Sequence, residues 1–410
     1  MAVNTIETTC CVVGGGPAGM MLGFLLARAG IKVTVLEKHA DFLRDFRGDT
    51  VHPSTLQMMH ELGLLDDFLK LPHSKVDHVS LQIGADTVRI ALLGLPTVCK
   101  YIAFMPQWDF LNFMAGHGKA YPSFDLRMRA EAMGLIEEGG RVVGVHAKTE
   151  VGDLDIRADL VVGCDGRHSR IRDAAGFKSD DLGAPMDVLW FRLPRLRSDG
   201  AEVVGHIESG RMLIMLDRDD YWQCAFVIPK GGIEAVKAKG LDAFRANVAA
   251  LAPFKLGDRV DVITGWDDVK LLTVTVDLLR RWYRPGLLCI GDAAHAMSPI
   301  GGVGINLAVQ DAVAAANILV EPLRRGAVTE EALAAVQKRR SFPTRATQRL
   351  QLTMQNNLIG PALAGSGKRP HAPLLMKMLQ WPLLRLIPAR ALALGFRPEH
   401  IRTPDVSAAR

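Results

Sequence analysis

A glycine-rich turn near the N-terminus is the first part of this sequence whose residue types and spacing could bind a ligand. Gly14, Gly16 and Gly19 match the pattern G-x-G-x-x-G, with Pro17 and Ala18 inside it. In such a turn the first glycine permits a tight bend, the second lets the backbone approach a pyrophosphate, and the third lets the following helix pack on a sheet. That helix also presents free N–H groups and its positive dipole end to phosphates. The turn therefore predicts a dinucleotide site.

An acidic residue follows the turn where a ribose contact is expected. Glu37 closes a second apolar run at residues 31–37, and Lys38 comes directly after it. A carboxylate accepts hydrogen bonds from ribose hydroxyls and repels a 2′-phosphate, so FAD or NAD is favoured over NADP here. We take both residues as candidates for cofactor binding. The alternative is a structural glycine turn beside a surface glutamate.

Two later motifs each follow an apolar run. The first is Cys-Asp-Gly at residues 164–166, which contains the candidate Asp165. The second spans residues 291–306 and supplies seven candidates for cofactor binding, namely Gly291, Asp292, Pro299, Gly302, Gly304, Ile305 and Asn306. A carboxylate between a buried strand and a glycine-rich turn suits a contact with the hydroxyls of a bound ligand.

The three motifs, in this order, resemble the class A flavoprotein monooxygenases, the p-hydroxybenzoate hydroxylase-like family, from about residue 8 to about residue 340. The resemblance implies bound FAD. It further implies that Asp292 bonds the ribityl chain, that Pro299 lies beside the isoalloxazine ring, and that Asp165 helps to hold FAD and contributes to the surface for the reduced nicotinamide. A helix opening at residues 304–306 would direct N–H groups at flavin N1 and O2, where they stabilise an anionic reduced flavin.

Further candidates depend on the same resemblance. Arg47 and Gln107 lie where the family places an arginine and a glutamine that contact the cofactor. The candidates for a catalytic role are His52, His295 and Pro299, and either histidine could titrate near neutral pH. The alternative is that His52 is a helix-entry residue and His295 a packed, hydrogen-bonded one. The residues assign no substrate-activating base.

The resemblance also implies a reaction. NADH or NADPH would bind transiently and reduce FAD, O2 would add to form a flavin C4a-hydroperoxide, and its terminal oxygen would pass to an aromatic or other electron-rich ring. The chain has no second G-x-G-x-x-G, which disfavours flavin reductases with two dinucleotide domains and implies that the nicotinamide donor binds transiently in a cleft, as in the resembled family. The expected partners are therefore a small aromatic substrate and O2, with the ring and the choice between NADH and NADPH left open.

Three alternatives to ring hydroxylation stay in view. Flavin halogenases carry a W-x-W-x-I-P segment, but residues 224–229 keep only its Ile-Pro end and lack both tryptophans. The residues do not distinguish a monooxygenase from a flavin-dependent dehydrogenase or reductase that uses no oxygen. A non-catalytic nucleotide-binding protein is disfavoured because Asp292, Pro299 and Asn306 accompany the glycines.

The elements that must position these residues follow from periodicity. An apolar run at 9–13, a helical run at 17–29 and a strand at 31–37 make a βαβ unit, which implies a parallel sheet covered by helices. Residues 187–276 instead alternate strand-like runs around one helical piece. We predict an α/β FAD-binding domain (Rossmann-like, of the glutathione-reductase type), an α+β substrate domain built on an antiparallel sheet, and a helical C-terminal region. The FAD-binding domain is expected at residues 1–75, 100–186 and 277–340. The substrate domain is expected at residues 76–99 and 187–276, and the helical C-terminal region at residues 341–410.

The substrate cavity is expected between the flavin edge and the antiparallel sheet. Strand-like runs in that sheet supply the candidate lining residues Met212, Ile214, Trp222, Cys224 and Phe226. Which face of each strand looks inward cannot be read from the runs, because residues at successive positions point to opposite faces.

The composition limits the remaining possibilities. Of 410 residues, 49% are hydrophobic and 23% charged, which is typical of globular proteins, and the diffuse net charge of +5 does not argue for nucleic acid. Six cysteines without a C-x-x-C pair indicate free thiols in a reducing compartment. We see no leader or uncharged apolar run long enough to span a membrane. We therefore predict a cytoplasmic protein with no metal site and no membrane association, whose C-terminal region packs on the body or forms a homodimer contact.

Overall fold

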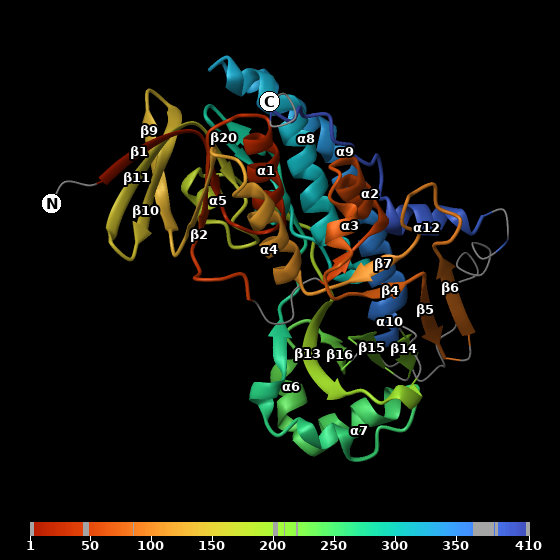
Figure 1. Cartoon of the computed structure of the whole chain (residues 1–410). Coiled ribbons are helices and arrows are strands. Elements are labelled where there is room, and N and C mark those ends of the chain that lie inside the picture. The colour runs from red at the N-terminus through yellow and green to blue at the C-terminus, as the bar shows by residue number, and fades with distance from the viewer. Residues whose placement is uncertain are drawn as a thin grey trace.

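The computed structural model describes residues 4–43, 49–84, 86–199, 204–208, 210–218, 220–363, 381 and 384–406. Within these ranges the chain forms two main β-sheets, and long helices run from one toward the other (Figure 1). The predicted Arg47 lies in the segment 44–48, outside the described residues.

The first sheet carries the predicted nucleotide turn. Its eight strands are β1 (Asn4–Val13), β2 (Val33–Glu37), β8 (Phe124–Met128), β9 (Glu131–Glu138), β10 (Arg141–Thr149), β11 (Gly152–Gly163), β19 (Tyr283–Arg284) and β20 (Leu287–Cys289). β1 pairs in parallel with β2 and β11, β2 with β8, and β11 with β20. β9, β10 and β11 form an antiparallel meander at one side. The parallel part matches the predicted βαβ unit.

The helix after β1 shows why the local prediction succeeds. α1 (Pro17–Arg28) has proline at its first position and is followed by Gly30, whose φ of +80° ends the helical path. It packs between α4 (Gln107–Gly118) and α8 (Gly304–Arg324), which cover the sheet. β1 begins earlier than predicted, at Asn4, because its outer half pairs with the meander strand β11.

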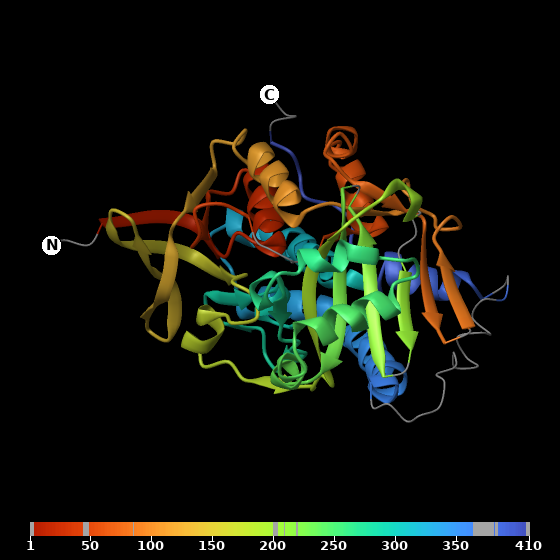
Figure 2. The same cartoon turned by 90° about the horizontal axis from the view of Figure 1, so that it is seen from below.

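The second sheet has seven strands and supports the expected substrate side. They are β5 (His78–Ile83), β6 (Asp86–Ala91), β13 (Met186–Pro194), β14 (Val204–Glu208), β15 (Arg211–Asp217), β16 (Tyr221–Pro229) and β17 (Lys270–Leu272). All neighbouring pairs are antiparallel except β14 with β5. Two helices, α6 (Ile233–Ala238) and α7 (Leu241–Leu251), lie against one face of this sheet (Figure 2).

Shorter elements connect the two sheets. The small strands are β3 (Thr50–Val51), β4 (Ser74–Val76), β7 (Ile102–Phe104), β12 (Ser179–Asp181) and β18 (Asp277–Leu279). The remaining α-helices before residue 300 are α2 (Pro53–Glu61), α3 (Leu65–Phe68) and α5 (Arg170–Ala174). Five 3₁₀ turns cover Arg197–Asp199, Gly257–Val262, Trp266–Asp268, Gly291–Ala293 and Ile300–Gly302.

The C-terminal region is helical only in part, which corrects the prediction for 341–410. Its described helices are α9 (Glu330–Met354), a π-helical turn (Gln355–Ile359), α10 (Gly360–Leu363) and α12 (Leu386–Ala393). Residues 395–406 contain no helix, because Gly395 has φ of +74° and two prolines follow. This segment runs beside α1, where the Val406 N–H donates to Arg28 O at 2.9 Å. Residues 364–380, 382–383 and 407–410 lie outside the described part.

The cysteines and the longest apolar segment complete the fold. All six cysteines are described and buried, and none of them forms a disulfide, as predicted. Among the described residues, the segment Ile300–Arg324 is apolar and long enough to cross a membrane by composition. However, 72% of its most apolar window is buried inside the protein, where α8 packs between α1 and α9.

One buried carboxylate fixes the place where the chain crosses between the sheets. Asp187 accepts hydrogen bonds from the Val274 N–H at 2.9 Å, from the Gly231 N–H at 2.8 Å and from Lys230 Nζ at 2.9 Å. Burial raises the pKa of Asp187, but these bonds, led by that from Gly231, outweigh it and hold the pKa below its usual value. Asp187 is 3% exposed and Val274 is buried, whereas Lys230 and Gly231 are exposed, so the Val274 N–H is the donor that depends most on this carboxylate.

We expect Asp187→Ala to lower the free energy of unfolding by about 1–3 kcal/mol, because the buried Val274 N–H loses its acceptor. Urea unfolding at neutral pH measures this change. Asp267→Ala, which removes an exposed carboxylate from the same region, should change it by less than about 0.5 kcal/mol. Equal losses in the two variants would show that Asp187 does not hold the crossing.

Candidate functional site

The glycine-rich turn is built by close backbone contacts. Gly14 has φ of +106°, and a Cβ atom there would lie 2.5 Å from Cys164 O. A Cβ atom on Gly19 would lie 1.9 Å from Gly14 O. These two glycines are therefore required by packing, which brings the first motif directly against the second.

Gly16 has a different reason to be glycine. A Cβ atom at this position would meet nothing within 4 Å, so the space in front of it is open. α1 starts at the next residue with no side-chain cap and no acidic residue in its first turn. Its first N–H groups therefore face this open space with the positive end of the helix dipole. The arrangement fits the pyrophosphate of a dinucleotide such as FAD.

The carboxylate of Glu37 lies beside this turn, at the end of β2. Glu37 Oε2 accepts from the Gly15 N–H at 3.1 Å, and Oε1 accepts from the His39 N–H at 3.0 Å. The backbone thus fixes the carboxylate next to the predicted phosphate site, where a ribose would follow. Lys38 is exposed.

The third motif reaches the same edge through Gly291. This residue has φ of +61°, and a Cβ atom on it would lie 3.2 Å from Ala18 Cβ and 3.4 Å from Ala308 Cβ. Gly291 thus packs between α1 and α8. The next residue, Asp292, is about one-third exposed, and its Oδ2 lies 3.6 Å from Arg167 Nη2. The structure therefore brings all three motifs to the ends of β1, β11 and β20.

Asp165 is turned away from the open space. Its Oδ1 accepts from Ser169 Oγ at 2.5 Å and its Oδ2 from the Ile171 N–H at 3.2 Å, so it caps α5. Burial raises the pKa of Asp165, against the lowering effect of these bonds. These bonds fix the Asp165 carboxylate in the turn that packs against Gly14, and its contact with FAD stays a prediction.

The loop from Pro299 to Gly304 offers a second uncapped helix start. Gly301 and Gly302 have φ of +75° and +62°, which turns the chain sharply into α8. α8 begins at Gly304 with no side-chain cap and no acid in its first turn, and a Cβ atom on Gly304 would meet nothing within 4 Å. These N–H groups suit the negative edge of a reduced flavin, as the sequence predicts.

The next two residues of this helix point inward. Ile305 is buried, and the Asn306 side chain bonds the segment before α2. Asn306 Oδ1 accepts from the His52 N–H at 2.9 Å and from Thr55 Oγ1 at 2.7 Å. Only the backbone of Asn306 is therefore available to a cofactor.

The two candidate histidines are both packed, which corrects their assignment as catalytic candidates. His52 is fully buried, and its Nδ1 lies 2.9 Å from Leu392 O on α12. Burial lowers the pKa of His52 to about 4. His295 is 1% exposed, and its Nε2 lies 2.6 Å from Asp311 Oδ2. Each histidine matches the alternative interpretation, as a structural residue.

A buried ionic network surrounds His295. Asp311 also accepts from Arg340 Nε at 2.8 Å and from the Gly291 N–H at 3.1 Å, and Arg340 pairs with Glu399 at 3.3 Å. Burial raises the pKa of Asp311, but His295 and Arg340 outweigh it and keep the carboxylate ionised. This network, which the sequence analysis missed, ties the C-terminal segment to the Gly291 turn. Its signal was Asp311 itself, the only acid between residues 293 and 320.

Gln107 joins a second buried pair, at the start of α4. Its N–H lies 3.4 Å from Asp49 Oδ1, and Asp49 Oδ2 accepts from Arg218 Nη2 at 2.7 Å. Burial raises the pKa of Asp49, with Arg218 as the main opposing influence. The pair joins Asp49 to the second sheet. Sequence spacing carries no signal for it, because its members are 169 positions apart.

Strand alternation divides the predicted substrate residues between two faces. Trp222, Cys224 and Phe226 pack with α7, on the outer face, so their assignment to the cavity is wrong. Phe226, for example, lies 5.4 Å from Phe244 of α7 between ring centroids. Met212 and Ile214 lie on the inner face, in one hydrophobic cluster with Ile300, the residue after Pro299. The inner face also carries Trp190, whose buried indole N–H has no partner among the described residues.

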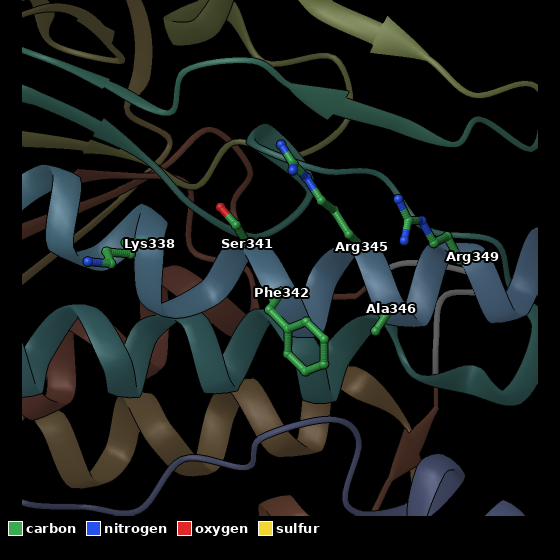
Figure 3. Close-up of a pocket in the computed structure, with 6 residues that line it drawn as sticks. All are labelled: Lys338, Ser341, Phe342, Arg345, Ala346 and Arg349. Carbon is green, nitrogen blue, oxygen red and sulfur yellow. The ribbon is translucent and has the colours of Figure 1, made fainter.

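A surface pocket lies elsewhere, along the exposed face of α9 (Figure 3). It has a volume of about 510 Å³ and is lined by Lys338, Ser341, Phe342, Arg345, Ala346 and Arg349. None of the sequence-predicted residues lines it. The described residues contain no group of three or more His, Cys, Asp or Glu that could hold a metal ion.

Several known proteins are similar to this chain in sequence or in fold. A family model described as FAD binding domain matches residues 7–350. The 6-methylpretetramide 4-monooxygenase of Streptomyces rimosus is 33% identical over 402 residues, which cover 97% of this chain and 94% of the relative. The fold is shared with two solved structures. The probable FAD-dependent monooxygenase pqsL of Pseudomonas aeruginosa has a TM-score of 0.75 at 20% identity, with 88% of this chain and 99% of that one covered. The p-nitrophenol 4-monooxygenase PnpA of Pseudomonas putida has a TM-score of 0.74 at 21% identity, with 94% and 97% covered.

The contrast between two glycines tests the pyrophosphate site. We expect Gly16→Ala to raise the Kd for FAD tenfold or more, which corresponds to a loss of at least about 1.4 kcal/mol of binding free energy. The stability of the apoprotein should not change. Gly19→Ala should instead lower the free energy of unfolding by about 1–3 kcal/mol, because its methyl group collides with backbone. Flavin fluorescence titration and urea unfolding measure the two effects. Wild-type FAD affinity in Gly16→Ala would exclude a pyrophosphate at this turn.

The buried His52 makes stability depend on pH. Its pKa is lower in the folded protein than in the unfolded chain, so protonation of the unfolded chain below pH 6.5 favours unfolding until about pH 4. Between neutral pH and pH 5 the folded state should lose about 2 kcal/mol from this group. His52→Gln should remove that part of the pH dependence in urea unfolding curves. An unchanged pH dependence in the variant would contradict the buried neutral state.

Proposed function

The chain belongs to the FAD-dependent aromatic monooxygenases, and from that premise we propose that its ring substrate lies between the Pro299 loop and the inner face of the seven-stranded sheet. The observation that carries this proposal is the meeting of the three motifs at one sheet edge. Gly14 packs on Cys164, and Gly291 packs on Ala18. The Pro299 loop leaves that edge, and Ile300 within it joins the inner-face cluster.

FAD fits the groups at this edge. We propose that Gly16 and the start of α1 hold the pyrophosphate, that Glu37 accepts from ribose hydroxyls and that Asp292 accepts from the ribityl chain. The start of α8 at Gly304 would stabilise negative charge on the reduced ring. When bound, FAD supplies the oxygen-activating chemistry, and NADH or NADPH is proposed as its transient reductant.

The protein's own contribution to the ring chemistry is an apolar surface that excludes water from the substrate. Met212, Ile214 and Ile300 exclude water from the ring site, and Trp190 offers one unpaired N–H to an oxygen on the substrate. A phenolic aromatic compound has this combination of apolar ring and polar edge. Two similar proteins, the 6-methylpretetramide 4-monooxygenase and the p-nitrophenol 4-monooxygenase, are named for ring compounds, which supports that choice.

The organisation of the chain is proposed on the same basis. We propose that the FAD-binding domain comprises residues 1–75, 100–186 and 277–340, which supply the strands of the first sheet. We propose that the substrate domain comprises residues 76–99 and 187–276, which supply the strands of the second sheet apart from the first residue of β13. The six unpaired cysteines support a cytoplasmic location. A homodimer contact through the C-terminal region belongs to the same proposal.

The proposed ring site at the inner face of the seven-stranded sheet can be tested with a larger side chain. We expect the purified protein to carry flavin and to oxidise NADH or NADPH in air faster with one member of a panel of phenols and aromatic acids, p-nitrophenol among them. Ile214→Trp should lower that stimulation at least about tenfold while FAD stays bound, because an added ring overfills the site. Leu271→Trp, at an exposed position of β17, serves as the matched control.

Three outcomes would count against the proposal. Equal stimulation in wild type and Ile214→Trp would place the substrate elsewhere. Bound flavin that NAD(P)H reduces but O2 does not reoxidise would indicate a dehydrogenase or reductase. A halogenated product in the presence of halide would indicate the halogenase alternative.

A further inference from the structure

Three glutamines form a row on the buried side of α9 and the π-helical turn that follows it. Gln348, Gln351 and Gln355 are spaced by three and four residues, so their side chains lie on one helix face. Their residues are 1%, 3% and 0% exposed. This face lies against the loop that leads into α8, and none of the three glutamines lines the surface pocket shown in Figure 3.

Each amide donates to that loop. Gln351 Nε2 donates to Ser298 O at 3.0 Å and to Ile300 O at 2.9 Å, the carbonyls on the two sides of Pro299. Gln355 Nε2 donates to Ser298 Oγ at 2.8 Å. Gln348 Nε2 donates to Ala296 O at 3.1 Å. Proline has no N–H of its own to anchor this part of the chain, so the helix supplies the donors.

The acceptor side of the same amides shows that packing alone does not explain them. The Oε1 atoms of all three glutamines are buried with no hydrogen-bond partner among the described residues. A buried unpaired carbonyl costs about 1–3 kcal/mol, whereas a methionine of similar length would carry no such cost. The glutamines therefore stabilise the fold through the hydrogen bonds that they donate, which go to the loop and, from Gln348 Nε2, also to Asp277 O of β18 at 2.7 Å.

The same stretch of helix touches the proposed ring site. Leu352, next to Gln351, and Ile359, at the end of the π-helical turn, belong to the inner-face cluster with Met212 and Ile300. A π-helical turn inside a helix frequently marks a functional site. One element thus contacts the loop on its polar side and the proposed substrate wall on its apolar side.

We propose that Gln351, with Gln348 and Gln355 on either side, is a positioning residue that holds Pro299 at the ring of the bound flavin. The inference rests on the proposed function, because that function places Pro299 beside the flavin. We call these three glutamines and their hydrogen bonds to the loop the clamp. Because Gln348 and Gln351 lie on α9 and Gln355 on the π-helical turn, the clamp fixes the distance between the loop and the flavin ring from outside the cofactor site. Without these hydrogen bonds the loop would be free to move and water would reach the ring site, so the oxygen chemistry that bound FAD would supply there would be uncoupled from the substrate.

The test uses the full-length holoenzyme and the variant Gln351→Met, which keeps the side-chain length and removes both donated bonds. We expect hydrogen exchange in a peptide covering residues 299–304 to rise about tenfold, the change that corresponds to about one net hydrogen bond. The visible circular dichroism of bound FAD should change, and dithionite-reduced enzyme should form peroxide faster in air. The Kd for FAD should change less than about threefold, because the pyrophosphate site is untouched. Asn356→Met, an exposed amide in the adjacent turn, is the matched control.

The outcomes separate this inference from the function on which it rests. Unchanged exchange in the 299–304 peptide, or an equal rise throughout the chain, would overturn the clamp while leaving FAD binding intact. An unchanged flavin signal in a variant with a loosened loop would show that the loop does not position the ring. If Gln351→Met does not fold, Gln355→Met removes a single bond and is judged by the same measurements. A wild-type protein that binds no FAD would overturn the proposed function itself.

Discussion

The close packing of three glycine turns at one edge of the first sheet is the constraint on which the rest of the structure depends. Gly14 leaves no room for a side chain against Cys164, and Gly291 lies against Ala18. These contacts place an uncapped helix start, a partly exposed aspartate and the Pro299 loop around one open space. Each of the three turns is made of local sequence, but the open space exists only where the three meet.

Buried charge surrounds that edge and connects it to distant parts of the chain. Asp311 accepts a hydrogen bond from the Gly291 N–H, and Arg340 links Asp311 to Glu399 in the C-terminal segment. A buried carboxylate with one partner removed is strongly destabilising, so this network makes the edge and the C-terminal segment cooperative. The Asp49–Arg218 pair connects the opposite side of the site to the seven-stranded sheet in the same way.

The face of a strand that looks inward decides which side chains can meet a substrate. In β15 and β16 the register pairs Met212 with Val227 and Leu213 with Phe226, so a shift of one residue exchanges the two faces. α6 and α7 cover the face that carries Phe226, and the other face is left to the Pro299 loop and α9. Helix placement, and not hydrophobicity, therefore selects the wall of the proposed ring site.

The sequence by itself determined the βαβ unit, the three motifs and their order, because each depends on residues within about twenty positions of one another. It also predicted that Gly304 opens a helix. It did not determine the direction of Asp165 and Asn306, the packing of His52 under α12, or the inner face of β16. Those features depend on which distant segments pack against each residue, and a one-dimensional pattern does not contain that information. Only the tertiary structure decided them, since side-chain partners such as Gln351 and Ser298 meet across long chain separations.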